Sequence, residues 1–232
     1  MKLVHTKYDL TLEVKENVVT VLSVENPKAY SEILGDIWNQ ANGGEGAFIL
    51  SEGNKIKALS KEIECIFNPF AVNCNDKKIL TKLYQELQKQ ANDFLQEETV
   101  EINGVLIDYL EKLMNGVPYH LTFDLDLDIG SILKGYNVLM EDTDCSLLEK
   151  LMEYMRAMSQ ICHIRSFVCV NLKSFFSKEE LKYLYEFAVY EKINIIVIES
   201  IQSEALIGEK GWILDKDLCI IELNELTAPV KR

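Results

Sequence analysis

Several features that would place the chain in a special class are scarce or missing. The 232 residues include only four prolines and eleven glycines, which argues against a disordered or collagen-like chain. No apolar run reaches the roughly 18 to 20 residues that a membrane-spanning helix needs. Charge follows Met1 too early for the apolar core of a signal peptide. With 48% apolar residues, we expect a soluble, cytoplasmic globular protein of one or two domains.

Cations are scarce as well. The chain has 24 lysines and arginines against 37 aspartates and glutamates, which gives a formal net charge of -13. Only Arg156, Arg165 and Arg232 are arginines. Evenly spread negative charge repels nucleic acid, because phosphate binding needs concentrated cations. A DNA-binding role therefore requires a local basic surface, which oligomerisation can concentrate.

Cysteine and histidine motifs are absent. The six cysteines include no C-x-x-C pair, and the three histidines stand in no H-x-x-x-H or H-E-x-x-H setting. Cys162 and His163 are adjacent, but neighbours on a strand point to opposite faces and cannot pair. These patterns favour buried thiols over disulfides, a zinc site or a cysteine nucleophile.

The apolar periodicity predicts an α/β protein. Short β-branched runs predict strands over 17–24, 166–172 and 193–199, and another strand over 218–223. A capping box, Ser177-x-x-Glu180, begins a helix between the second and third of these, as in a βαβ unit of a parallel sheet. Strands over 47–50 and 55–59 flank a Gly53-Asn54 turn, which predicts a hairpin.

The middle of the chain has a different pattern. Two amphipathic segments, 76–98 and 99–115, predict an αα-hairpin, and the alternating segment 119–128 predicts a strand. A further helix is expected over 144–160. We therefore predict a discontinuous α/β head domain with an inserted α-helical leg domain. The head comprises residues 1–74 and 118–232, and the leg comprises residues 75–117.

The turn after the first long strand carries no phosphate-binding motif. It reads SVENPK over 23–28, with no glycine, a carboxylate that would repel phosphate, and a proline that removes a donor. G-x-G-x-x-G is absent as well. We therefore exclude ATP hydrolysis by a standard P-loop.

Two charged groups remain as candidates. Asp124, Asp126 and Asp128 share one face of the predicted strand, with Glu141 and Asp142 downstream, and the set fits either a solvated edge or a Ca²⁺ shell. The segment fails the EF-hand pattern at its sixth and twelfth positions. Three lysines along the hairpin, which fit either a solvated face or a nucleic-acid surface, are Lys55, Lys57 and Lys61.

The order of these segments resembles the small adaptation protein of type II-A CRISPR systems, the Csn-two family. The resemblance covers roughly residues 3–223. It rests on a collinear set of segments: VTVLSVENP (19–27), YSEIL (30–34), DLDLDIGSILK (124–134), FVCVNL (167–172) with Leu181 and Leu184, IIVIE (195–199) and WILDKD (212–217).

The resemblance implies a ring-shaped homotetramer with α/β heads and helical legs, whose core is similar to a P-loop ATPase fold without its phosphate motif. It implies a non-enzymatic, calcium-dependent protein that holds linear double-stranded DNA during spacer acquisition, beside the CRISPR integrase and the type II effector nuclease. By this resemblance Lys55, Lys57 and Lys61 bind DNA. The resemblance also implies that calcium is held by Asp124, Asp126, Asp128, Glu141 and Asp142.

Two alternatives are open at this point. The chain could be a metal-dependent nuclease or phosphotransferase that uses Asp124, Asp126 and Asp128. It could also be an acidic protein-interaction scaffold without DNA contact, which the net charge favours.

Overall fold

The computed structural model describes residues 1–141 and 144–226, and the chain forms two compact units. The head unit comprises residues 1–73 and the chain from residue 144 onward, and the helical unit comprises residues 74–143. The head contains β1 (Lys2–His5), β2 (Leu10–Glu13), β3 (Val19–Val24), α1 (Pro27–Ala41), β4 (Phe48–Glu52), β5 (Lys55–Lys57), α2 (Leu59–Glu62), β6 (Ile63–Ile66), η1 (Pro69–Ala71), α6 (Leu147–Gln160), β7 (Ser166–Val170), η2 (Leu172–Ser174), α7 (Lys178–Glu191), β8 (Asn194–Glu199), β9 (Glu209–Leu214) and β10 (Ile220–Glu222). The helical unit contains α3 (Lys77–Phe94), α4 (Gln96–Met114) and α5 (Ile129–Gly135).

A six-stranded sheet forms the centre of the head. Its order is β10-β9-β3-β8-β7-β6, and every neighbouring pair except β10 with β9 is parallel. All six residues of β3 are buried, as expected for a parallel strand covered on both faces. The predicted parallel pairing of the strands on either side of α7 is confirmed. The α/β class predicted from the sequence is therefore correct.

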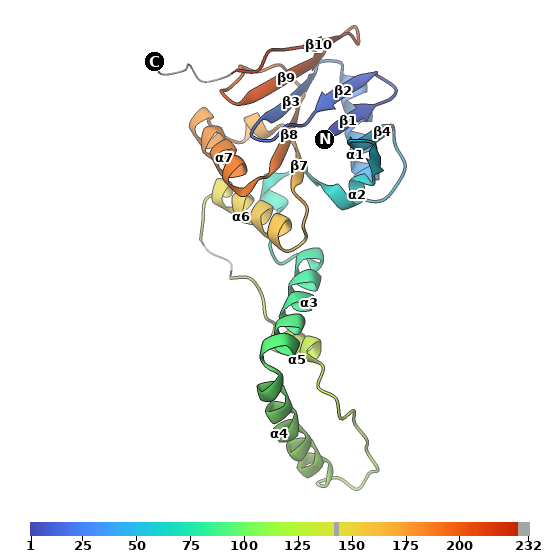
Figure 1. Cartoon of the computed structure of the whole chain (residues 1–232), viewed down its shortest axis with the longest axis vertical. Coiled ribbons are helices and arrows are strands. Elements are labelled where there is room, and N and C mark those ends of the chain that lie inside the picture. The colour runs from blue at the N-terminus through green and yellow to red at the C-terminus, as the bar shows by residue number, and fades with distance from the viewer. Residues whose placement is uncertain (142–143, 227–232) are drawn as a thin grey trace. The chain divides into compact units, whose positions relative to one another are not determined.

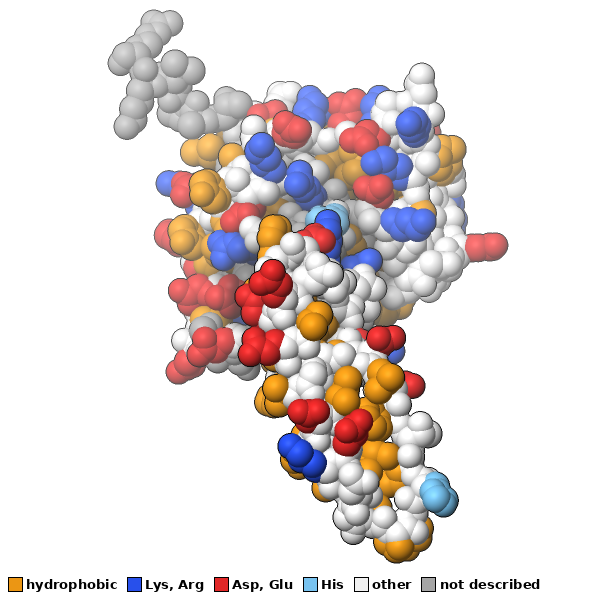
Figure 2. Space-filling model, turned by 60° about the horizontal axis from the view of Figure 1, so that its bottom comes forward, with side chains coloured by type: hydrophobic (Ala, Val, Ile, Leu, Met, Phe, Trp, Pro, Cys, Tyr) orange, Lys and Arg blue, Asp and Glu red, His pale blue; other side chains and the backbone are white. Residues whose placement is uncertain are grey.

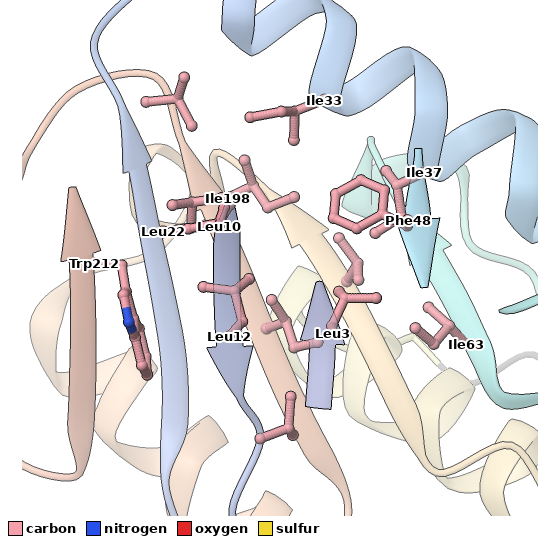
Figure 3. Packing of buried hydrophobic residues seen from close by; sticks show 14 of the residues in the cluster. Leu3, Leu10, Leu12, Leu22, Ile33, Ile37, Phe48, Ile63, Ile198 and Trp212 are labelled. Atoms are coloured by element: carbon pink, nitrogen blue, oxygen red, sulfur yellow. The ribbon is translucent and has the colours of Figure 1, made fainter. Parts of the chain in front are cut away.

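A second, antiparallel sheet of order β2-β1-β4-β5 packs with α1 against one face of the large sheet. Figure 3 shows the resulting core, in which Leu10 of the small sheet lies near Leu22 and Ile198 of the large one, and Leu3 and Leu12 belong to the same cluster. Further aromatic side chains, Phe48 and Trp212, belong to the same buried cluster. The hairpin prediction is confirmed by the antiparallel pair β4 and β5.

The other face of the large sheet is covered by α6 and α7 (Figure 1). Both helices begin with complete capping boxes, Ser146 with Glu149 and Ser177 with Glu180, each of which satisfies two backbone amides that a helix start leaves free. Phe167 of β7 is fully buried. The helices predicted over 144–160 and 177–192 are confirmed.

The two long helices of the helical unit do not form the predicted αα-hairpin. Leu95 alone separates α3 from α4, its amide still donates to the Ala91 carbonyl, and its carbonyl still accepts from the Thr99 amide. An αα-hairpin needs a loop of about two to five residues to reverse the chain. With one residue between them, α4 instead continues in the general direction of α3 (Figure 1).

The segment after α4 returns along the helical unit without forming the predicted strand over 119–128. Within that unit the described residues offer no partner strand for it. Side chains of the helices hold it instead: Asn103 donates to the Leu125 carbonyl at 2.8 Å, and Tyr84 donates to the Val138 carbonyl at 2.8 Å. The return segment therefore belongs to the helical unit, whereas the sequence-based division places residues 118–143 in the head.

No helix within the described ranges is both long and apolar enough to cross a membrane.

Candidate nucleic-acid interface and acidic segment

The basic hairpin of the head arises from a tight turn. Gly53 has φ of +57°, a conformation that favours glycine, and it reverses the chain so that Lys55 pairs with Glu52 across the strands. α2 follows directly and carries Lys61, which is exposed. The hairpin and α2 thus bring the three predicted DNA-binding lysines into one short stretch of the head.

These three lysines are not equivalent. Lys57 Nζ lies 2.6 Å from Glu52 Oε2 and 3.3 Å from Glu62 Oε1, and the hydrogen bond to Glu52 raises the pKa of Lys57. Lys55 and Lys61 are exposed and form no ion pair with any residue that the structure describes. Two adjacent carboxylates therefore offset the charge of Lys57, whereas Lys55 and Lys61 present theirs to solvent.

Cations do not form a dense patch on the face of the head that Figure 2 displays. Lysine and arginine side chains alternate there with aspartate and glutamate side chains. Because non-specific DNA binding needs several lysines on one surface, one copy of this face supplies a weak field for a phosphate backbone.

The acidic candidates of the helical unit lie on the return segment. Asp124 and Asp126 are exposed and stand in backbone without strand pairing. Asp128 has a structural role as the N-cap of α5: its carboxylate accepts from the backbone amides of Gly130 and Ser131, both at 3.0 Å, and from Ser131 Oγ at 2.5 Å. The hydrogen bond from the Ser131 hydroxyl, followed by those from the two amides, lowers the pKa of Asp128.

Among the described residues, the predicted calcium ligands do not assemble into a cluster. Glu141 is exposed, and Asp142 lies outside the described residues. Among the residues that are described, no three His, Cys, Asp or Glu side chains stand close enough to hold a metal ion. Both oxygens of Asp128 are already engaged in capping α5. The described carboxylates of one chain thus do not fit a complete calcium shell of six to eight oxygens.

The turn after β3 is internally satisfied. Asn26 caps α1, and its side-chain oxygen accepts from the amides of Lys28 and Ala29, both at 3.1 Å. Its side-chain nitrogen donates to the Lys216 carbonyl at 3.0 Å. Amides that a phosphate cradle would present to a ligand are here bonded to a neighbouring side chain. The implied similarity to an ATPase fold stays a prediction.

An exposed apolar stripe on α4 is a feature that the sequence-based prediction did not anticipate. The predicted αα-hairpin would cover the apolar side of the amphipathic segment 99–115, but no residue of α4 is buried. Successive intervals of four, three and four residues align the residues of the stripe on one side of the helix, which is the spacing of a helix-packing seam. The seam consists of Ile102, Leu106, Tyr109 and Leu113, which are 51%, 37%, 61% and 58% exposed. Figure 2 shows hydrophobic side chains along the helical unit.

A comparison with protein-family models gives a match that covers more than half of the chain. Residues 40–218 match the family described as CRISPR-associated protein (Cas_Csn2). The matched region begins near the end of α1 and includes both the basic hairpin and the acidic return segment. This agrees with the resemblance that the collinear segments indicated. The chain belongs to the Cas_Csn2 family of CRISPR-associated proteins.

Proposed function

We propose that this protein holds the ends of linear double-stranded DNA during CRISPR spacer acquisition, as a non-enzymatic assembly of several copies. Membership of the family indicates a CRISPR-associated role in adaptation. DNA binding, ring assembly, a tetramer, and cooperation with the integrase and the effector nuclease are the further parts of the proposal.

The exposed seam of α4 is the observation that carries the proposal. A helix with an apolar stripe and no buried residue has not completed its packing, since apolar side chains at such intervals usually face another helix. A second copy of α4 offers a matching stripe. Association also answers the charge problem, because several copies can bring their Lys55 and Lys61 side chains toward one DNA duplex.

The seam is tested by sizing. Leu106→Asp with Tyr109→Asp should convert the assembly into smaller species in multi-angle light scattering, because buried carboxylates would be unpaired at the interface. Val100→Asp is the matched control, since Val100 is 67% exposed on the same helix but lies away from the seam. Equal masses for the double variant and the native chain would contradict the assignment.

The DNA claim is tested with gel shifts of linear and closed-circular plasmid at several salt concentrations. We expect retardation of linear DNA alone, because a closed ring can load only over an end. Lys55→Ala with Lys61→Ala should reduce the salt dependence of binding by about 0.9 in logarithmic slope for each phosphate that is no longer neutralised. Lys57→Ala should change it less, since Glu52 and Glu62 already neutralise Lys57. Retardation of both DNA forms, or of neither, would refute end-holding.

Calcium enters the proposal only through the family resemblance. The described carboxylates of one chain do not assemble a shell, so a calcium site would need ligands beyond them, such as those of a second copy. Calcium added to gel shifts and to calorimetry tests this part. Tight binding that Asp124→Ala with Asp126→Ala abolishes would restore these residues as ligands.

The alternative of a nuclease is tested in the same reactions. Labelled DNA should remain intact with Mg²⁺ or Mn²⁺, because the described carboxylates that would hold a catalytic metal are dispersed or engaged in capping a helix. Cleavage that Asp124→Ala removes would favour the enzyme instead.

A further inference from the structure

Residues 200–208, which connect β8 to β9, cross β3 of the large sheet without forming a helix or strand. We call them the strap. On one side the strap borders an apolar groove of about 830 Å³, whose walls include Val19, Tyr185 and Val189. On the other side it borders a small cavity of about 20 Å³. Ala205 lines both spaces, so the strap is the wall between them.

A buried lysine ties the strap to the sheet. Lys173 Nζ donates to Glu209 Oε2 at 2.8 Å and to the Glu204 carbonyl of the strap at 3.2 Å. The same Glu209 oxygen accepts from the Leu206 amide of the strap at 2.9 Å, and its other oxygen accepts from the Tyr185 hydroxyl at 2.7 Å. The side chains of Lys173 and Glu209 are only 9% and 2% exposed.

Apart from backbone bonds such as that of the Leu206 amide, the strap contributes little to its own closure, because its apolar and charged side chains lie mostly at the surface. Ile201 and Ile207 are 74% and 60% exposed, and the pair between Lys178 and Glu204 lies at the surface, where ion pairs stabilise weakly. A segment with few buried apolar contacts and irregular backbone opens locally at low free energy. The buried pair is different, because removing one partner leaves an uncompensated charge inside the protein.

We propose that Lys173 is a latch that holds the strap closed, and that release of this latch joins the groove beside α7 to the cavity under the strap. Lys173 is suited to this role because one ammonium group contacts both the sheet, through Glu209, and the strap, through the Glu204 carbonyl. The inference concerns the head alone and is independent of DNA binding.

Hydrogen exchange of the full-length chain, followed by mass spectrometry, tests the latch. In Lys173→Met we expect amides of residues 200–208 to exchange about tenfold faster or more, with α6 unchanged. Lys178→Ala is the control, because it removes only the exposed ion pair with the Glu204 side chain and should leave exchange near the native rate. The double variant Lys173→Met with Glu209→Gln should exchange more slowly than Lys173→Met, because the buried charge is gone.

Native exchange of residues 200–208 in a folded Lys173→Met chain would overturn the proposal. So would equal acceleration by Lys178→Ala, since the surface pair would then account for closure. If Lys173→Met does not fold, Glu209→Gln carries the test: it removes the carboxylate that pairs with the ammonium group of Lys173 and should also accelerate exchange of the strap. Native exchange in that variant would likewise refute the latch.

Discussion

The two units of this protein differ in where their apolar residues lie. In the head, aliphatic and aromatic side chains from two sheets and from α1, α2, α6 and α7 form buried layers, and β3 is buried along its whole length. In the helical unit, only Ile79 and Ala91 are buried hydrophobic residues among those described, while the seam of α4 is exposed. The head thus buries a large core within one chain, whereas the helical unit leaves most of its apolar side chains partly or largely exposed.

The largest expected effect is the loss of stability when a core residue of the head is truncated, compared with truncation of an exposed residue of α4. Phe167→Ala should reduce the free energy of unfolding by about 3 to 5 kcal/mol, because Phe167 is fully buried and its removal leaves a cavity. Tyr109→Ala in α4 should change it by about 0.5 kcal/mol or less in dilute, monomeric protein, because Tyr109 faces solvent. Urea unfolding measures both. Similar losses from the two substitutions would show that the units do not differ as described.

A smaller expected effect is the pH dependence of stability that a buried carboxyl group gives to the head. Burial, above all, raises the pKa of Glu199 at the end of β8. A carboxyl group with a raised folded pKa stabilises the fold while protonated and loses that contribution as pH rises through the folded pKa. Glu199→Gln should therefore raise the melting temperature at pH 8 by about 2 °C and change it little at pH 4. A drop at pH 8 would contradict this prediction.

The smallest expected effect comes from a pKa shift in the helical unit that is opposite in direction to that of Glu199. Hydrogen bonds lower the pKa of Asp128, so its contribution is present above its unfolded pKa and is lost as pH falls through the folded value. Asp128→Ala should weaken the hydrogen-exchange protection of α5 at pH 7, with the difference shrinking below about pH 4. Asp126→Ala, an exposed neighbour that does not cap the helix, should leave protection unchanged. Equal effects of the two substitutions would remove the cap assignment.

Prediction from sequence succeeded where one segment contains the whole signal. β3 and β8 are rich in β-branched residues, β7 is a short apolar run, and the capped helix α7 between β7 and β8 specifies a parallel pair. It failed where the structure of a segment depends on another segment that packs against it. Alternating residues over 119–128 have no neighbouring strand among the described residues, and helical periodicity reveals an apolar face without telling what covers it.

The candidate site shows the same limit. Sequence placed Lys55, Lys57 and Lys61 together, but the ion pairs of Lys57 depend on how the hairpin brings Glu52 and Glu62 close. One signal was available and unused: Asp128 directly precedes a short helix whose third residue is Ser131, which is typical of an N-cap. This pattern predicts that the carboxylate of Asp128 caps a helix, which is a structural role, rather than binding a metal ion.

The strand order also determines how long β3 waits for its neighbouring strands while the chain is being synthesised. β3 lies at the centre of the large sheet between β8 and β9, yet roughly 190 residues separate its first residue from the first residue of β9. At about 5 to 20 residues per second, a ribosome takes about 10 to 40 seconds to deliver that partner. During this interval the apolar β3 emerges without neighbours and the inserted helices are made first. A nascent chain halted before residue 194 should therefore depend on chaperones to stay soluble.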